Sequence, residues 1–192
     1  MKPIDHPAPE RKQAILRRYE ARLRRAEARP EYVGMLPAGP LTFFAERQVG
    51  PSLYLVAYEF TCTFPHPGNT LRCVDLVGKD REGRWRALEG VATGFPNLLT
   101  LVAVDVNVAS PSHYLVVHGK VLNPAASRIQ VTFATRPAVT EPVVLPYYMV
   151  VIDRTGDFLP RSLTVYDFAG NVLQHTDFPW PPDCEPDAPE FG

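Results

Sequence analysis

The sequence predicts a mostly β fold: an antiparallel β-sandwich of the immunoglobulin or fibronectin type, with one amphipathic α-helix at the N-terminus. Short stretches in which apolar and polar residues alternate recur along the chain, and this period of two is the signature of half-buried strands. Clusters of Gly, Pro and Asn separate these stretches, and the 21 prolines among 192 residues are about twice the average usage. Turns at such short intervals favour a sandwich over a helical domain.

Charge and composition divide the chain into three predicted segments. Residues 1–31 form a basic N-terminal helix, because they hold nine Lys or Arg against five Asp or Glu, whereas the rest of the chain holds eleven against sixteen. Residues 32–176 form the sandwich domain. Residues 177–192 are acidic and rich in proline, a composition that buries too little apolar surface to fold. We therefore expect them to form an extended tail.

The N-terminal helix is predicted over residues 8–29, since Pro30 cannot continue it. Its other faces are mostly arginine, but one narrow apolar stripe follows helical spacing: Ile15, Leu16, Tyr19 and Leu23. The stripe can pack on the protein's own sandwich or fray, or it can bind a partner helix, an anionic membrane surface or nucleic acid. Interspersed glutamates and the lack of aromatics for base stacking argue against nucleic acid. We expect the helix to dock on a β-sheet of its own or a second copy, and to mediate homo-oligomerisation.

Strands in the first half of the sandwich are predicted at residues 41–49, 52–64, 71–77, 84–89 and 98–109. A turn centred on Pro67-Gly68 would place Cys62 opposite Cys73. Directly opposed residues of antiparallel strands lie close enough for a disulfide. The two cysteines could thus be bonded, or they could be reduced core residues, as is usual without export.

Strands in the second half are predicted at residues 114–121, 127–133, 147–152, 163–168 and 172–174. The first two can pair antiparallel across Asn123-Pro124, where proline cannot donate to a ladder. The last two flank Gly170, which can adopt positive φ at no steric cost, and so form a terminal hairpin.

Part of this second half resembles a group of small bacterial β-sandwich ectodomains, of Gram-positive type, whose function is uncharacterised. The pattern is G-x-V-x-x-P before an alternating strand, then a Tyr-rich apolar strand, then Y-D-x-x-G-x-V. It spans residues 113–174 and is carried by Gly119, Val121, Pro124, Tyr147, Tyr148, Tyr166, Asp167, Gly170 and Val172. The resemblance implies a β-sandwich at the cell surface. The chain shows no signal peptide and no integral membrane segment, which by itself predicts a cytoplasmic protein.

The sequence contains no nucleophile elbow, P-loop, dinucleotide fingerprint or zinc-ligand spacing, so no catalytic, cofactor or metal residues are assigned. His113 and His118 are an odd number of residues apart on one predicted strand and therefore face opposite sides. We predict a non-catalytic binding or interaction module of unknown ligand and unknown protein partner. The alternative is an enzyme whose site is assembled from loops. A polar pocket that gathers His66, His113, His118 or Asp105 would favour the enzyme.

Overall fold

The computed structural model describes residues 5–28, 36–64, 68–93, 103–104, 106–109, 111, 113–144, 146–153 and 160–178. Strands take up 60% and helix 14% of the structure, which confirms the mostly β prediction with antiparallel sheets and one N-terminal helix. The immunoglobulin or fibronectin type stays a prediction, as do the segment boundaries at residues 31 and 176. The chain forms two compact units, residues 1–98 with 107–112 and residues 99–106 with 113–192. Each is described by itself.

The first unit contains one helix and an antiparallel sheet. β3 is central: β4 pairs with one edge, β2 and β1 pair with successive parts of the other edge, and β5 follows β4. The elements are α1 (Pro9–Ala28), β1 (Leu36–Pro37), β2 (Thr42–Gly50), β3 (Leu53–Phe64), β4 (Thr70–Lys79), β5 (Trp85–Thr93) and β6 (Asn107–Ala109).

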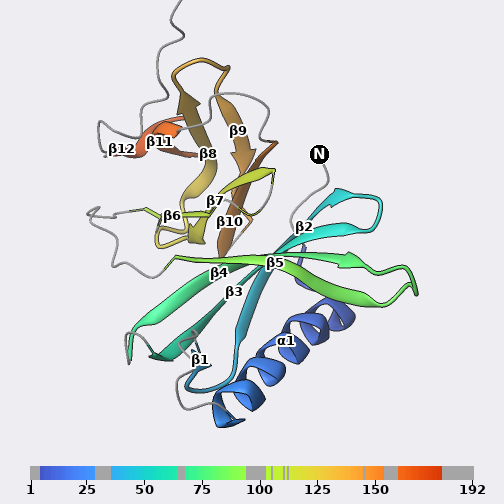
Figure 1. Cartoon of the computed structure of the whole chain (residues 1–192). Coiled ribbons are helices and arrows are strands. Elements are labelled where there is room, and N and C mark those ends of the chain that lie inside the picture. Colours follow the sequence, from blue (N-terminus) through green and yellow to red (C-terminus); the bar gives the residue numbers. More distant parts are fainter. Residues whose placement is uncertain are drawn as a thin grey trace, which may run out of the picture. The chain divides into compact units, whose positions relative to one another are not determined.

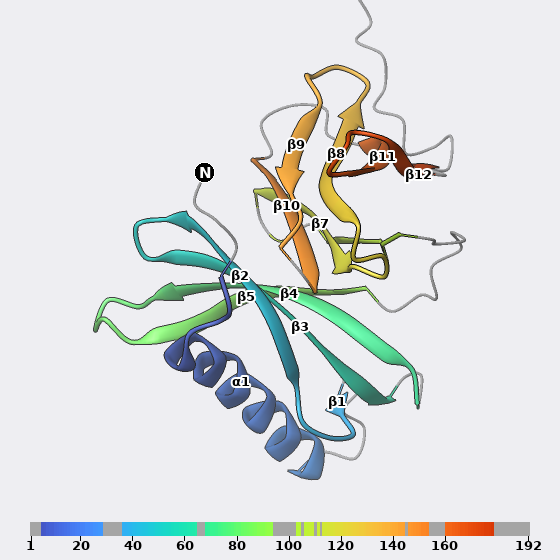
Figure 2. The same ribbon diagram turned by 180° about the vertical axis from the view of Figure 1, so that it is seen from behind.

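Helix α1 lies along one face of this sheet (Figures 1 and 2). Pro9 occupies the first helical position, where its missing N–H costs nothing. Ile15 and Tyr19 are buried from the helix side. Alternate residues of the two central strands meet them from the sheet: Val56, Tyr58, Phe60 and Cys62 of β3, and Leu71, Cys73 and Val77 of β4. The predicted helix bounds of 8–29 differ by one residue at each end from the observed bounds, Pro9–Ala28.

The predicted register of the β3–β4 hairpin is wrong. Cys73 is paired with Tyr58, and the N–H of Cys62 donates to the carbonyl oxygen of Asn69 at 2.8 Å. Cys62 and Cys73 are thus four residues out of register, about 13 Å along the strands, which is beyond the reach of a disulfide. On its other edge, the end of β3 pairs with β1. Both cysteines are buried thiols on the helix side of the sheet.

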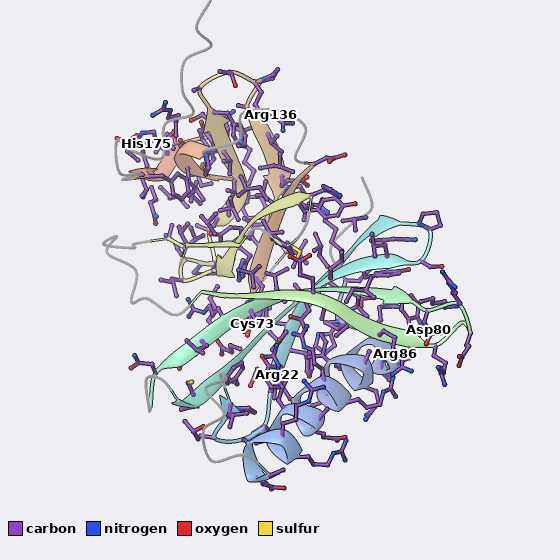
Figure 3. All side chains as sticks on the ribbon, viewed as in Figure 1. Arg22, Cys73, Asp80, Arg86, Arg136 and His175 are labelled. Atoms are coloured by element: carbon purple, nitrogen blue, oxygen red, sulfur yellow. The ribbon has the colours of Figure 1, made fainter. Side chains whose placement is uncertain are left out.

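The β4–β5 turn is organised by one carboxylate. Asp80 Oδ1 accepts hydrogen bonds from the N–H groups of Glu82 and Arg84, each at 2.9 Å, while Oδ2 accepts from Arg86 Nε at 3.0 Å. Figure 3 shows Asp80 and Arg86 side by side at this turn. The backbone and arginine donors lower the pKa of Asp80. The charged Gly78–Gly83 segment is therefore a well-ordered turn.

The second unit contains two antiparallel arrangements of strands. β10 pairs with β7, and a four-stranded sheet has the order β12-β11-β8-β9. The elements are β7 (Tyr114–Lys120), β8 (Ala126–Phe133), β9 (Val139–Pro142), β10 (Tyr147–Asp153), β11 (Pro160–Asp167) and β12 (Val172–Asp177). The predicted hairpin around Gly170 is present, with φ of 89° at that glycine.

Two other predictions for this region are wrong. β7 does not pair with β8, because Leu122 and Asn123 both donate to the carbonyl oxygen of Ala103, which ties the turn to another segment. The single long strand predicted over 98–109 is also wrong, because within the described residues only Asn107–Ala109 form a strand, β6, and Val104 forms an isolated bridge with Val121. Gln174 Oε1 accepts from the N–H groups of both Ala103 and Val104, at 2.8 and 3.2 Å. Successive N–H groups that share one acceptor cannot alternate as they do in a ladder.

Candidate functional site

In the described part of the first unit, two ion pairs with buried carboxylates join α1 to the sheet. Arg11 of α1 binds Glu46 of β2 through two parallel hydrogen bonds, Nε to Oε2 at 2.6 Å and Nη2 to Oε1 at 2.5 Å. Bidentate pairing of this kind fixes orientation as well as charge. Glu46 Oε2 also accepts from the N–H of Ala8 at 3.2 Å, so the same carboxylate holds the start of the helix.

Aromatic rings enclose the Arg11 guanidinium. Its central carbon lies 4.0 Å from the centroid of the Tyr54 ring and 5.1 Å from that of Trp85. Trp85 contacts Tyr54 edge to face at 5.5 Å. The hydrogen bonds with Glu46 raise the pKa of Arg11, while burial opposes them. Arg11 therefore stays charged in a site that it shares with a carboxylate and two rings.

The second ion pair belongs to a larger polar cluster, which we define as Arg18, Tyr19, Tyr58, Cys73 and Asp75. Arg18 Nη2 donates to Asp75 Oδ2, and the Tyr58 hydroxyl donates to Asp75 Oδ1 at 3.1 Å. The hydroxyls of Tyr19 and Tyr58 share a hydrogen bond of 3.0 Å. The side chain of Asp75 is 1% exposed and that of Arg18 is 19% exposed. Both carboxylate oxygens are therefore occupied beneath the helix.

The cluster depends on a glycine in the neighbouring strand. Gly90 of β5 is paired with Asp75 of β4. A Cβ atom added at Gly90 would lie 1.9 Å from Asp75 Oδ1 and 2.6 Å from Arg18 Nη2. The space that a side chain would take at residue 90 is filled by the ion pair. This requirement is steric, because no positive φ is involved at Gly90.

Burial dominates the electrostatics of the cluster. It raises the pKa of Asp75, while the charge and hydrogen bond of Arg18 act against this rise. Burial lowers the pKa of Arg18, but Asp75 and the tyrosines outweigh it, and the net direction is upward. Burial also raises the pKa values of Tyr19 and Tyr58. For Cys73, burial and the charge of Asp75 raise the pKa to about 12.

These values indicate what the cluster can do chemically. At neutral pH Cys73 is a protonated thiol that is 2% exposed, and only the thiolate acts as a nucleophile. The tyrosine hydroxyls also keep their protons and bind each other and Asp75. Within the described residues, no three His, Cys, Asp or Glu side chains are arranged to hold a metal ion. The cluster is built to hold α1 on the sheet.

The structure separates the residues that the sequence singled out. Ile15 and Tyr19 are buried against the sheet, Leu16 is half-buried, and Leu23 is 37% exposed. His118 of β7 is fully buried, whereas His113 is exposed in the turn before β7 and thus lies outside the strand predicted to hold both histidines.

The two remaining candidates of the enzyme alternative, His66 and Asp105, lie outside the described residues. No helix in the described part of the chain is both long enough and apolar enough to cross a membrane.

Sequence reasoning missed one exposed feature of the second unit, the turn between β11 and β12. Phe168 is 83% exposed and Val172 is 58% exposed. Asp167 closes the turn by accepting from the N–H of Asn171 at 2.8 Å and from Asn171 Nδ2 at 2.9 Å. We call Asp167–Val172 the hairpin tip. An alternating strand pattern assigns Phe168 to a strand, and only the closed turn shows that it is exposed.

No known protein family, curated protein or solved structure matches this chain. The resemblance to bacterial β-sandwich ectodomains therefore stays a prediction.

The Arg18–Asp75 pair should show strong energetic coupling. Asp75→Asn leaves a buried cation without its partner, and Arg18→Met leaves a buried carboxylate, so each should lower the free energy of unfolding by about 3–5 kcal/mol. The loss of unfolding free energy in the double variant should be about 1–3 kcal/mol smaller than the sum of the losses in the two single variants. Urea unfolding of the four proteins measures this coupling.

A matched control is the exposed pair Arg84 and Glu82, with side chains 56% and 66% exposed. The cycle of Arg84→Met and Glu82→Gln should give a coupling of about 0.2–1 kcal/mol. Equal coupling in the two cycles would show that burial adds nothing to the Arg18–Asp75 pair.

The cluster also predicts a loss of stability at alkaline pH. Tyr19, Tyr58 and Cys73 hold their protons to higher pH in the folded chain than in the unfolded chain. Their stabilisation is complete below the unfolded pKa values, 9.0 for Cys73 and 10.0 for the tyrosines, and is lost as the pH rises toward the folded values. Each group that is protonated in the folded chain but ionised in the unfolded chain lowers the free energy of unfolding by about 1.4 kcal/mol per pH unit. Urea unfolding between about pH 8 and 11 should show the fall.

Tyr19→Phe removes one of these protons, so its stability should fall less steeply above pH 10, the unfolded value for tyrosine. An identical slope in wild type and Tyr19→Phe would contradict the assignment of Tyr19 to the titrating cluster.

Proposed function

We propose that this protein is a non-catalytic interaction module. The observation that carries the proposal is the use of the polar cluster within the protein: Arg18 Nη2 and the Tyr58 hydroxyl bind Asp75, and Tyr19 binds Tyr58, between α1 and the sheet. General acid–base catalysis needs a titratable group within hydrogen-bonding reach of a bound substrate. In this cluster the same groups are used to dock a helix. They stabilise a scaffold whose exposed surface is then available for binding.

The charges of α1 support a protein partner over a polyanion. Arg11 and Arg18 are neutralised by Glu46 and Asp75, and Arg22 lies over the Tyr19 ring at 5.2 Å. Figure 3 shows Arg22 and Cys73 near the junction of α1 and the sheet. The exposed Arg17, Arg24 and Arg25 of α1 are matched in number by Glu10, Glu20 and Glu27, and the partly exposed Lys12 and Arg22 leave a surplus of two positive charges. A phosphate backbone or an anionic membrane is bound by many clustered basic residues, and a surplus of two on a surface with interspersed glutamates favours such binding only weakly.

Homo-oligomerisation through α1 stays a proposal, and the burial of the helix restricts it. Ile15 and Tyr19 are covered by the protein's own sheet. Of its apolar stripe, the docked helix can offer a second copy only Leu23, which is exposed, and part of Leu16. A helix-mediated contact would therefore be small and would depend on Leu23.

The proposal is tested by the thermal stability of the full chain with small molecules. The probes are Zn²⁺, Mg²⁺, nucleotides, sugar phosphates, amino acids and acyl thioesters at saturating concentration. A ligand that binds only the folded state raises the melting temperature by mass action. We expect no probe to raise it.

The informative control is Asp75→Asn, which disturbs the polar cluster without changing its volume. A probe that stabilises the wild type but not Asp75→Asn would place a small-molecule site at the cluster and would favour the enzyme.

A further inference from the structure

We propose that the hairpin tip is a contact surface between two copies of this chain, arranged about a twofold axis. This inference rests on the proposed function, because it names the partner of the interaction module. It differs from helix-mediated association, because it places the contact on the second unit.

The first step is the apolar surface that the tip exposes. Phe168 is the most exposed large apolar side chain in the described part of the chain, and Val172 on the same turn is the second. An isolated exposed apolar residue is ordinary, but here the two most exposed large apolar side chains of the described residues belong to one hairpin tip. Aromatic residues at the centre of an interface contribute much of its binding free energy.

The second step is the rigidity of the turn. The N–H of Asp167 donates to the carbonyl oxygen of Asn171 at 3.0 Å, and the N–H of Gly170 donates to that of Asp167 at 3.2 Å. The Asp167 side chain adds its two hydrogen bonds to Asn171, and Gly170 supplies the positive φ of 89°. Phe168 is therefore presented on a fixed backbone. A surface ordered before binding loses little conformational entropy when it binds.

The third step is the charge beside the patch. Arg128 of β8 is exposed and lies over the Tyr166 ring at 4.5 Å. Its Nη2 is 3.7 Å from the position of a Cβ on Gly170, so the guanidinium reaches the turn. Hydrogen bonds from Asn171 lower the pKa of Asp167, which keeps that carboxylate ionised. Within the described residues, neither Arg128 nor Asp167 forms an ion pair.

These groups make the patch complementary to itself. In a twofold contact each surface meets an identical one, so residues at the axis face their counterparts, and any other contact between two different residues occurs twice. Phe168 and Val172 of the two copies can cover each other at the centre. Arg128 of each copy can then face Asp167 of the other. A membrane fits less well, because a single aromatic residue inserts weakly and the charges of Arg128 and Asp167 cancel, which leaves no net attraction to anionic lipid.

The test is sedimentation velocity of the full chain over about 10 µM to 1 mM, since a contact this small should dissociate in that range. We expect a monomer–dimer equilibrium in the wild type. Phe168→Ala should raise the dissociation constant about tenfold or more, and Arg128→Glu should weaken the dimer by placing like charges opposite each other. Phe168 is so exposed that its replacement should leave the far-UV circular dichroism unchanged.

Two matched variants locate the contact. Leu88→Ala removes a leucine that is 55% exposed on the first unit and should leave the dimer intact. Leu23→Ala removes the exposed residue of α1 and should also leave it intact. A wild type that is monomeric throughout, or a dimer that survives Phe168→Ala, overturns the proposal. Loss of the dimer in Leu23→Ala would place the contact on the helix instead.

Cross-linking tests the symmetry. In a Cys184→Ser background, Val172→Cys should form an intermolecular disulfide on mild oxidation, whereas Leu88→Cys should not. Equal cross-linking of both variants overturns the twofold contact. A monomer that binds phosphatidylserine vesicles through Phe168 would identify the tip as a membrane contact. A monomeric result alone leaves the interaction-module proposal standing, and only a small-molecule ligand at the polar cluster refutes that.

Discussion

The buried ion pair between Arg18 and Asp75 determines how α1 sits on the sheet. A buried pair adds little net stability relative to apolar residues of the same size, but one charge without the other is strongly destabilising. The helix can therefore dock only where the guanidinium meets the carboxylate. Tyr58 binds the second oxygen of Asp75 and Tyr19 binds Tyr58, and Gly90 leaves the space that the ion pair fills. We infer that the pair fixes the register of the helix, while the apolar contacts supply the stabilisation.

Two turns before Arg18, the same face of α1 forms a second ion pair with the sheet. Arg11 and Arg18 are seven residues apart, so they lie on one side of the helix with Ile15 between them. Each arginine meets a carboxylate of the sheet, Glu46 or Asp75. The positive charge of residues 1–31 is thus partly used inside the molecule, against the acidic surplus of the rest of the chain. Two ion pairs along one helix fix both the position and the direction of the helix on the sheet.

Sequence patterns predict the parts of this fold that depend on local spacing. The helix bounds follow from the prolines and the apolar stripe, and the terminal hairpin follows from Gly170. The hairpin register at Cys62 and Cys73 could not be found this way, because a turn centred on Pro67-Gly68 predicts a register four residues away from the pairing that forms, in which Cys73 lies opposite Tyr58. Asp75 interrupts an apolar strand, and its role becomes clear only from Arg18, 57 residues earlier. No local sequence pattern shows that residue 90 must be glycine, because the space of its side chain is taken by Asp75 and Arg18, which are distant in sequence.

The most direct test of the central claim is the stability of Gly90→Ala, alone and combined with Asp75→Ala. In a strand, glycine to alanine is otherwise favourable by about 0.5–1 kcal/mol. Here the added methyl would overlap Asp75 Oδ1 and Arg18 Nη2, and the variant should lose about 1–3 kcal/mol of unfolding free energy in urea. Gly39→Ala is the control, because nothing lies within 4 Å of its Cβ position. In the Asp75→Ala background the cost of Gly90→Ala should disappear. A cost that persists there, or a Gly90→Ala variant as stable as Gly39→Ala, would contradict the account.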